Sequence, residues 1–126
     1  MIHSLFRLRN GNDIVGYMKV FSQGNAEFSH DQFWWTSTHI DYQSKDHYCG
    51  IPDKNNRPLF ELDVVKLKPT SPTQTILGVI QFKASEQAFI VIDLDTQDEY
   101  NLFNDSGPIF HKSQLAFVGC SFEEKN

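Results

Sequence analysis

The sequence has little of what a catalytic or membrane-bound protein usually shows. No stretch approaches the roughly 20 apolar residues of a membrane-spanning helix, and the opening MIHSLFRLRNG lacks the apolar core of a signal peptide. The only two cysteines, Cys49 and Cys120, lie far apart and match no zinc-binding spacing. Neither a glycine-rich phosphate-binding loop nor a G-x-S-x-G motif is present. We therefore expect a cytoplasmic protein with free thiols and without a cofactor or a membrane segment.

Positive charge is also scarce. Eleven Lys and Arg stand against 16 Asp and Glu, which gives a formal net charge of -5. This deficit of cations disfavours nonspecific nucleic-acid binding, which depends on neutralising phosphate groups. A small-barrel nucleic-acid-binding protein stays open as an alternative function, on the condition that one basic group converges on a single face. That group consists of Lys54, Arg57, Lys66 and Lys68.

Strand-forming sequence is abundant. Hydrophobic residues make up 40% of the 126 residues, which is enough apolar material for one core. Asn10-Gly11 is a strong hairpin signal, because both residues tolerate a positive φ. Residues 26–48 show no clear period; we expect short strands near 33–36 and 38–42 and a helical turn at 29–33 capped by Ser29. Elsewhere, alternating and β-branched runs predict strands at residues 5–9, 13–21, 63–69, 75–83, 88–94, 99–103 and 114–122.

The fold class that follows is mainly β. Closely spaced strands in the second half imply a compact, highly curved sheet that is closed or nearly closed. We expect a single domain over residues 1–126. Within it, residues 1–48 form an amino-terminal β-hairpin segment and residues 49–126 form a small β-barrel.

The stretch CGIPDKNNRPLFELDVVKL, residues 49–67, resembles the signature of the YopX-like proteins of phages and prophages. The segments LFRLRNGNDIVGYMKV and FVGCSFEEK resemble the opening and the end of that family. Two departures are Asn56 and Leu62, which stand where the family has glycine. The residues that match the central signature are Gly50, Asp53, Lys54, Asn55, Glu61, Asp63, Val65 and Lys66.

The resemblance implies an amino-terminal β segment followed by an SH3-like barrel, formation of oligomers and a phage or prophage origin, hence the cytoplasm of a bacterial host. It implies no activity. The residues of the signature favour a structural role for this loop: Asp53 and Asn55 bond nearby backbone N–H groups, and Asn56 adopts a left-handed conformation. Of Glu61 and Asp63, one accepts backbone N–H bonds and the other faces solvent.

The best candidates for chemistry are histidines, aspartates and a cysteine that lie within 20 residues. Zinc could use three such ligands and a water, but the spacings match no known metal signature, so a metal-binding protein or enzyme is only a further alternative. A Cys49–His47 nucleophile pair lacks an orienting third group. The acidic run Asp93, Asp95, Asp98 and Glu99 lacks the glycine of a calcium loop. The clustered residues are His30, Asp31, His39, Asp41, His47 and Cys49.

Aromatic residues crowd together in the same region. Adjacent residues of a strand point to opposite faces, so Trp34 and Trp35 cannot share one core. We expect Phe33, Trp34 or Trp35 to lie at the interface of a homo-oligomer; burial of both indoles within the chain is the alternative. The expected function is that of a phage- or prophage-encoded accessory protein without catalytic activity. It would bind protein partners, including a host or phage protein, and one version is an acidic inhibitor of host machinery.

Overall fold

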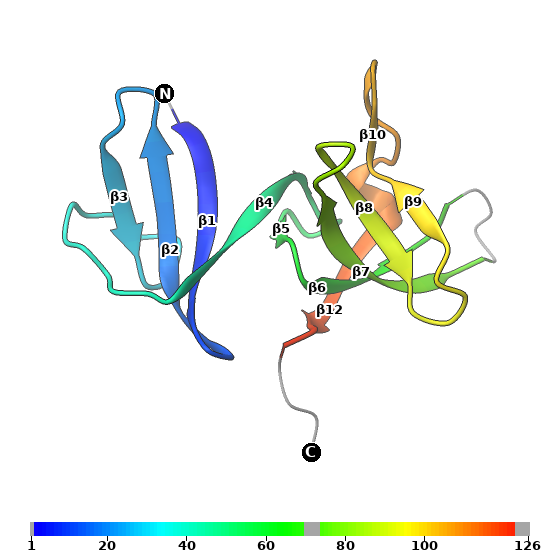
Figure 1. The fold of residues 1–126 in the computed structure, drawn as a ribbon, viewed down its shortest axis with the longest axis horizontal. Coiled ribbons are helices and arrows are strands. Elements are labelled where there is room, and N and C mark those ends of the chain that lie inside the picture. The colour runs from blue at the N-terminus through cyan, green and yellow to red at the C-terminus, as the bar shows by residue number, and fades with distance from the viewer. Residues whose placement is uncertain (1, 70–73, 123–126) are drawn as a thin grey trace. The chain divides into compact units, whose positions relative to one another are not determined.

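The structure is a computed structural model that describes residues 2–69 and 74–122. It confirms a mainly β fold built from antiparallel sheets (Figure 1). The chain groups into two compact units, unit 1 (residues 1–48) and unit 2 (residues 49–126). Among the described residues, no helix has the length and apolar character needed to cross a membrane.

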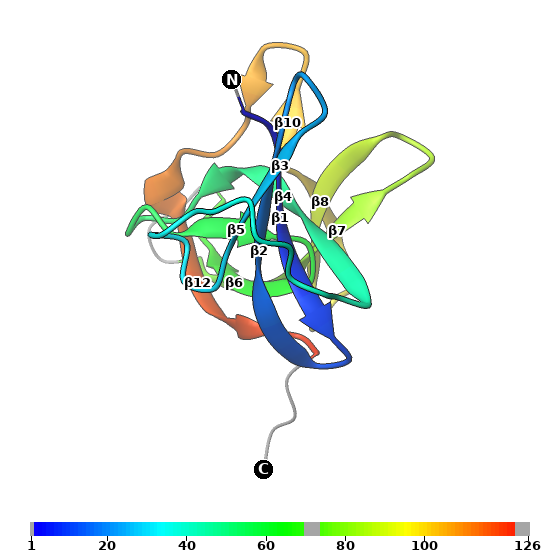
Figure 2. The ribbon, with the colours of Figure 1, turned by 90° about the vertical axis from the view of Figure 1, so that its left-hand side faces the viewer.

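Unit 1 is built on a hairpin. Strand β1 (Ile2–Asn10) pairs antiparallel with β2 (Asp13–Phe21), and Asn10 lies opposite Asp13 (Figures 1 and 2). Gly11 has a positive φ of 60° in the turn, as the Asn-Gly signal predicts, whereas Asn10 is the last residue of β1 and has no positive φ. Strand β3 (Ala26–Ser29) pairs with β2, and the first part of β4 (Ser44–Pro52) pairs with β1.

One face of this sheet carries a small apolar core. Phe6, Leu8, Met18 and Phe28 are buried, and the loop of residues 30–43 covers them with Ile40 and Tyr42. Gly16 makes this cover possible. A Cβ atom at Gly16 would lie 2.7 Å from the Ser29 carbonyl oxygen and 2.8 Å from Cδ1 of Ile40. The loop can therefore pack closely only because β2 has no side chain there.

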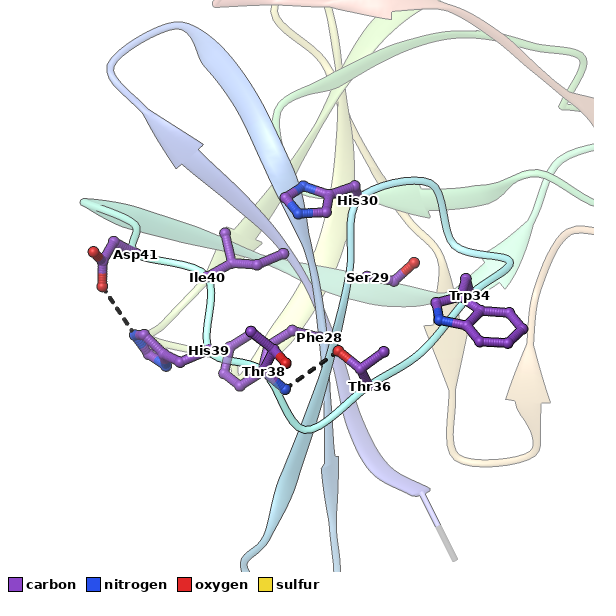
Figure 3. Close-up of a pocket in the computed structure, with 9 residues that line it drawn as sticks. All are labelled: Phe28, Ser29, His30, Trp34, Thr36, Thr38, His39, Ile40 and Asp41. Atoms are coloured by element: carbon purple, nitrogen blue, oxygen red, sulfur yellow. Dashed lines mark hydrogen bonds and ion pairs between the residues drawn. The ribbon is translucent and has the colours of Figure 1, made fainter.

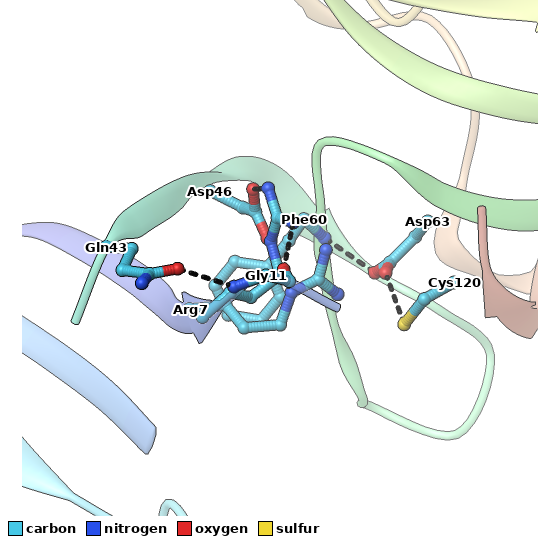
Figure 4. Close-up of polar contacts among 8 residues, drawn as sticks. Arg7, Gly11, Gln43, Asp46, Phe60, Asp63 and Cys120 are labelled. Atoms are coloured by element: carbon cyan, nitrogen blue, oxygen red, sulfur yellow. Dashed lines mark hydrogen bonds and ion pairs between the residues drawn. The ribbon is translucent and has the colours of Figure 1, made fainter. Parts of the chain in front are cut away.

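The same sheet buries a charged cluster. Arg7 and Asp46 lie opposite each other on β1 and β4 and are each only 2% exposed. The Asp46 carboxylate accepts hydrogen bonds from Nε of Arg7 and from Nε and Nη2 of Arg9, at 2.8–2.9 Å (Figure 4). The side chains that neutralise Asp46 are thus supplied by the strand next to it.

Unit 2 contains an antiparallel sheet with the strand order β12-β6-β7-β8-β9. A short hairpin and the 3-10 turn η1 (Lys112–Gln114) precede the last strand. Strand β5 pairs with β4 in a second five-stranded sheet, whose strand order is β3-β2-β1-β4-β5. The elements are β5 (Pro58–Phe60), β6 (Asp63–Leu67), β7 (Ile76–Lys83), β8 (Ala88–Asp93), β9 (Glu99–Asn101), β10 (Phe103–Asn104), β11 (Gly107–Pro108) and β12 (Leu115–Cys120).

The core of unit 2 is larger than that of unit 1. Alternate residues of β6, Val65 and Leu67, are fully buried, as period-2 alternation requires. A closed barrel is not found: among the described residues, β12 and β9 are the edges of the sheet, and no pairing joins them. The buried residues of this core are Cys49, Ile51, Leu59, Val65, Leu67, Ile76, Ile80, Val91, Leu102, Phe110 and Leu115.

The expectations for residues 26–48 were wrong. Residues 33–36 and 38–42 form no strands; they belong to the loop, which touches the sheet through a single-residue bridge between Phe28 and Thr36. No helical turn forms at residues 29–33. Strands lie on either side instead, in β3 and β4. The β propensity of the Trp, Thr and Ile side chains in the loop is outweighed by hydrogen bonds that its backbone N–H groups donate to the side-chain oxygens of Ser29 and Asp31.

Candidate binding surfaces

The loop of residues 30–43 is shaped by two short polar side chains at its start. The Ser29 hydroxyl accepts hydrogen bonds from the backbone N–H groups of Asp31 and Gln32, at 3.2 and 2.8 Å. The Asp31 carboxylate accepts those of Phe33 and Trp34, at 2.8 and 3.0 Å. These last two bonds hold the pKa of Asp31 below its ordinary value, because they favour the charged form.

This loop separates the two indole rings. Trp35 is half-buried: its ring lies 4.1 Å from the Lys19 ammonium, and its Nε1 donates to the Gln32 carbonyl oxygen at 3.1 Å. Trp34 is 76% exposed and Phe33 is 89% exposed. Of the candidate interface residues Phe33, Trp34 and Trp35, the first two therefore present their rings to solvent. The Trp35 side chain instead contacts Lys19 and donates a hydrogen bond to the Gln32 carbonyl oxygen of the same loop.

A hollow of about 340 Å³ lies beside Trp34 (Figure 3). Trp34 stands at one side of it, and His39 and Asp41 stand at the other. His39 Nε2 lies 3.4 Å from the Asp41 carboxylate, and its ring packs edge-on against Phe28. The complete lining is Phe28, Ser29, His30, Trp34, Thr36, Thr38, His39, Ile40 and Asp41.

The loop that carries the family-like signature is organised by Asp53. Its carboxylate accepts the backbone N–H groups of Asn55 and Arg57 within the turn, and that of Phe117 on β12. Burial tends to raise the pKa of Asp53, but these backbone donors hold it below the ordinary value. Asn56 has a φ of 63° at the tip of the turn. The carboxylate therefore joins this turn to a strand more than 60 residues away.

A second carboxylate stabilises the next turn. Asp63 is 1% exposed and accepts the Phe60 backbone N–H at 2.8 Å, while the Cys120 thiol donates to its other oxygen at 3.6 Å (Figure 4). Glu61 is half-buried. Leu62, between them, has a φ of 75°. A left-handed leucine is strained, and it occupies one of the positions at which the chain departs from the YopX-like signature.

The basic group converges in part. Lys54, Lys66 and Lys68 line one hollow of about 320 Å³, together with Thr75, Ser113, Gln114, Leu115 and Ala116. Arg57 does not line it; its guanidinium lies over the Phe117 ring, 3.7 Å from the centroid. Gly50, with a φ of 98° within β4, and Asn55, in the turn, do not line this hollow.

The clustered histidines, aspartates and cysteine do not converge. Among the described residues, no group of three or more His, Cys, Asp or Glu side chains could hold a metal ion. His39 and Asp41 are brought together, but His30 contacts the Val15 carbonyl oxygen and His47 packs on Phe6. Cys49 is buried, and this burial raises its pKa to about 12, so its thiol is no nucleophile at neutral pH.

The acidic run forms a tight turn between β8 and β9. Asp93 accepts the backbone N–H groups of Asp95 and Thr96, and these bonds hold its pKa below the ordinary value. Asp95, Asp98 and Glu99 are exposed, and Glu99 pairs with Lys83 at 2.7 Å. The run therefore forms a turn with one buried carboxylate, Asp93, and three exposed ones.

Several contributors to these surfaces were missed in the sequence. Thr75, Ser113 and Gln114 line the lysine hollow, yet no local pattern connects them with Lys54 or Lys66. Ser29 and Asp31 did carry a signal, since Ser and Asp two residues apart favour side-chain-capped turns. Comparison with known families, curated proteins and solved structures finds no match.

Proposed function

We propose that the protein is a non-catalytic binding protein that recognises another polypeptide through Phe33 and Trp34. The observation that supports this function is the exposure of both rings on a loop held by its own hydrogen bonds. Tryptophan is enriched among residues that dominate binding energy. An aromatic ring of this kind offers about 150–250 Å² of apolar area, and exposed apolar patches mark interaction sites.

The fixed conformation of the loop favours binding. Asp31 holds the backbone of both aromatic residues, and Trp35 is tied down beside them by Lys19 and Gln32. Less conformational freedom is lost when a partner binds a side chain whose backbone is already ordered. The hollow next to Trp34 gives a partner side chain a place to enter, with Ile40 and Phe28 on its wall.

Two backbone conformations support membership of the YopX-like family. Asn56 and Leu62 have φ values of 63° and 75°, and both stand where that family has glycine. Glycine is the residue that adopts such values without strain. The proposal therefore includes an SH3-like arrangement of unit 2, a phage or prophage origin and a place in the bacterial cytoplasm. An acidic inhibitor of host machinery is one form that such an accessory protein takes.

The partner that we propose first is a second copy of the chain. Two-fold association would cover Phe33 and Trp34 of both copies at once, and two-fold dimers are the commonest oligomers. If the chain does not associate with itself, the same rings would serve to bind a host or phage protein. No observation favours the metal-binding or enzymatic alternative over these two.

The experiment is sedimentation velocity at micromolar to high micromolar concentration. We expect the wild type to form a dimer and the Phe33→Ser/Trp34→Ser variant to stay monomeric, because the variant loses the exposed aromatic area. Phe82→Ser is the matched control, since Phe82 is also an exposed aromatic residue (43%) but lies on β7. It should associate as the wild type does.

A wild type that stays monomeric would overturn self-association and leave the host or phage partner to be tested. That test is a pull-down from a bacterial lysate with the wild type and the double variant side by side. A partner retained equally by both proteins would refute the proposed role of the aromatic loop.

A further inference from the structure

The lysine hollow of unit 2 gathers cations that have no anionic partner among the residues that the structure describes. Lys54, Lys66 and Lys68 line it, and none of them forms an ion pair or a side-chain hydrogen bond with another described residue. No carboxylate is among the described residues that line it. The hollow thus carries a local excess of positive charge, although the whole chain, with 16 acidic and 11 basic side chains, has a negative net charge.

The fold builds this group from three separate backbone connections to β12 and the residue before it. The N–H of Lys54 donates to the Leu115 carbonyl oxygen at 2.9 Å. Lys66 lies opposite Ala116 in the β6–β12 pairing. The N–H of Lys68 donates to the Gln114 carbonyl oxygen at 3.0 Å. Residues 114–116 thus bring together lysines from a turn, a strand and the end of that strand.

The neighbouring polar groups are also fixed in place. The Gln114 amide donates to the Lys68 carbonyl oxygen at 2.8 Å and accepts from the His111 backbone N–H at 2.7 Å. Asp53 anchors the turn that carries Lys54 through Asn55, Arg57 and Phe117. The backbone that positions the ammonium groups is therefore already ordered, and a ligand need order only the lysine side chains.

This composition favours phosphate groups as ligands. Lysine ammonium groups act as strongly hydrated point charges that bind phosphate, and the hydroxyls of Thr75 and Ser113 can add hydrogen bonds. Three ammonium groups exceed what a single monoanion would neutralise, so several neighbouring phosphates fit the charge better than one. The described residues of the lining include no Arg, Asn or aromatic side chain, so they offer neither the bidentate base contacts nor the stacking that read a nucleobase.

We infer that this hollow binds adjacent phosphate groups, as found in a linear oligophosphate or in the backbone of a single-stranded nucleic acid. Binding is independent of base sequence, weak, and strongly dependent on salt, because the net charge of -5 opposes it outside the hollow. This activity goes beyond the proposed polypeptide binding. It lies in unit 2 and uses neither Phe33 nor Trp34.

The test compares two variants of equal net charge. Lys54→Gln/Lys66→Gln/Lys68→Gln removes the hollow's cations, and Lys19→Gln/Lys45→Gln/Lys83→Gln removes three lysines elsewhere; each change takes the formal charge from -5 to -8. The probes are inorganic tripolyphosphate, by calorimetry, and a fluorescent oligo(dT), by anisotropy, both at 50 mM salt. Circular dichroism checks that each variant is folded. Amide chemical shifts of the wild type show where tripolyphosphate binds.

We expect the hollow variant to bind at least about tenfold more weakly, and the control variant to keep most of the affinity. Neutralising three phosphates predicts a slope of about -2 for log K against log salt with oligo(dT), so affinity falls roughly 20-fold from 50 to 200 mM. Tripolyphosphate binding alone assigns a free oligophosphate; comparable or tighter oligo(dT) binding assigns a nucleic-acid backbone. Equal losses in both variants, shifts that map elsewhere, or no binding of either probe would overturn the inference.

Discussion

Units 1 and 2 both bury carboxylates, but they neutralise them with different donors. In unit 1, Asp46 is neutralised by the guanidinium groups of Arg7 and Arg9. In unit 2, Asp53 and Asp93 accept backbone N–H groups of the turns that they begin. The first arrangement fixes which residue of β1 faces which residue of β4. The second fixes the path of a turn, and Asp53 also joins its turn to β12 through the Phe117 backbone N–H.

Positive φ values occur in both units. In unit 1 they lie at Gly11, Gly24 and Gln32. In unit 2 they lie at Gly50, Gly107 and Gln87, and also at Asn56, Leu62 and Gln97. Each of the last three lies within four residues of Asp53, Asp63 or Asp93, in that order. The carboxylates of unit 2 therefore stabilise turns in which side chains adopt conformations that glycine adopts without strain.

Removal of the Asp46 carboxylate should have the largest effect. Asp46→Ala removes the buried carboxylate that Arg7 and Arg9 both contact, and breaking a buried ion pair costs about 3–5 kcal/mol in the free energy of unfolding. Asp41→Ala is the control in the same unit, because that side chain is fully exposed; it should change the value by less than about 0.5 kcal/mol. Urea denaturation measures both.

Amide hydrogen exchange shows which strands lose stability in Asp46→Ala. We expect faster exchange in β1 and β2 than in β6, β7 and β8 when Asp46 is replaced. A loss below about 1 kcal/mol would mean that the cluster stabilises unit 1 no more than an exposed ion pair does. Equal acceleration in both sets of strands would remove the distinction between the units.

Acid should destabilise unit 2 through its turn carboxylates. The pKa of Asp53 is lowered in the folded chain, so its contribution is present above the unfolded pKa, near 3.9, and is lost as pH falls through the folded pKa. Asp53→Ala should lower the free energy of unfolding at pH 7 by about 2 kcal/mol, since charged hydrogen bonds contribute about 1.5–3 kcal/mol. It should also flatten the fall in stability between pH 5 and pH 2, relative to the wild type.

Asp95→Ala is the matched control, an exposed aspartate that uses only its backbone N–H in a turn of the same unit. Its stability at pH 7 should stay close to that of the wild type. The same pH dependence in the wild type and in Asp53→Ala would show that other groups control the acid transition.

The smallest effect is expected at Leu62. Relief of its left-handed strain should make Leu62→Gly as stable as the wild type or up to about 1 kcal/mol more stable, although glycine gains freedom in the unfolded chain. Leu62→Val should lose about 1–2 kcal/mol, because a β-branched residue fits a positive φ worse. Thermal unfolding of both variants shows whether each is more or less stable than the wild type. A valine variant more stable than the glycine variant would show that side-chain packing, not strain, dominates there.

The strands of unit 2 could be predicted because their signal is local. Residues 75–83 and 88–94 were expected as strands, and β7 and β8 occupy Ile76–Lys83 and Ala88–Asp93. β-branched and apolar residues mark them clearly. Strand β4 was missed because one of its buried positions is Asp46, which reads as a surface residue until its arginines are known. Which strands lie at the edges of the sheet could not be predicted either, because pairing between strands far apart in the sequence leaves no local pattern.

The candidate surfaces were predictable to different degrees. The crowding of Phe33, Trp34 and Trp35 is visible in the sequence, but the different burial of the two indoles depends on Asp31, Gln32 and Lys19. Lys54, Lys66 and Lys68 were grouped by sequence, whereas their common hollow depends on residues 113–116, far along the chain. Arg57, grouped with them by sequence, does not line that hollow, and its guanidinium lies over the Phe117 ring.

Because both thiols are buried, their chemical labelling can measure how often the packing of unit 2 opens. Cys49 and Cys120 are 2% and 6% exposed, and both belong to unit 2. A thiol-reactive reagent can modify them only after the packing around them has loosened. The rate of labelling at neutral pH therefore measures how often unit 2 opens. Because unit 1 has no cysteine, the same measurement is insensitive to opening of the hairpin alone.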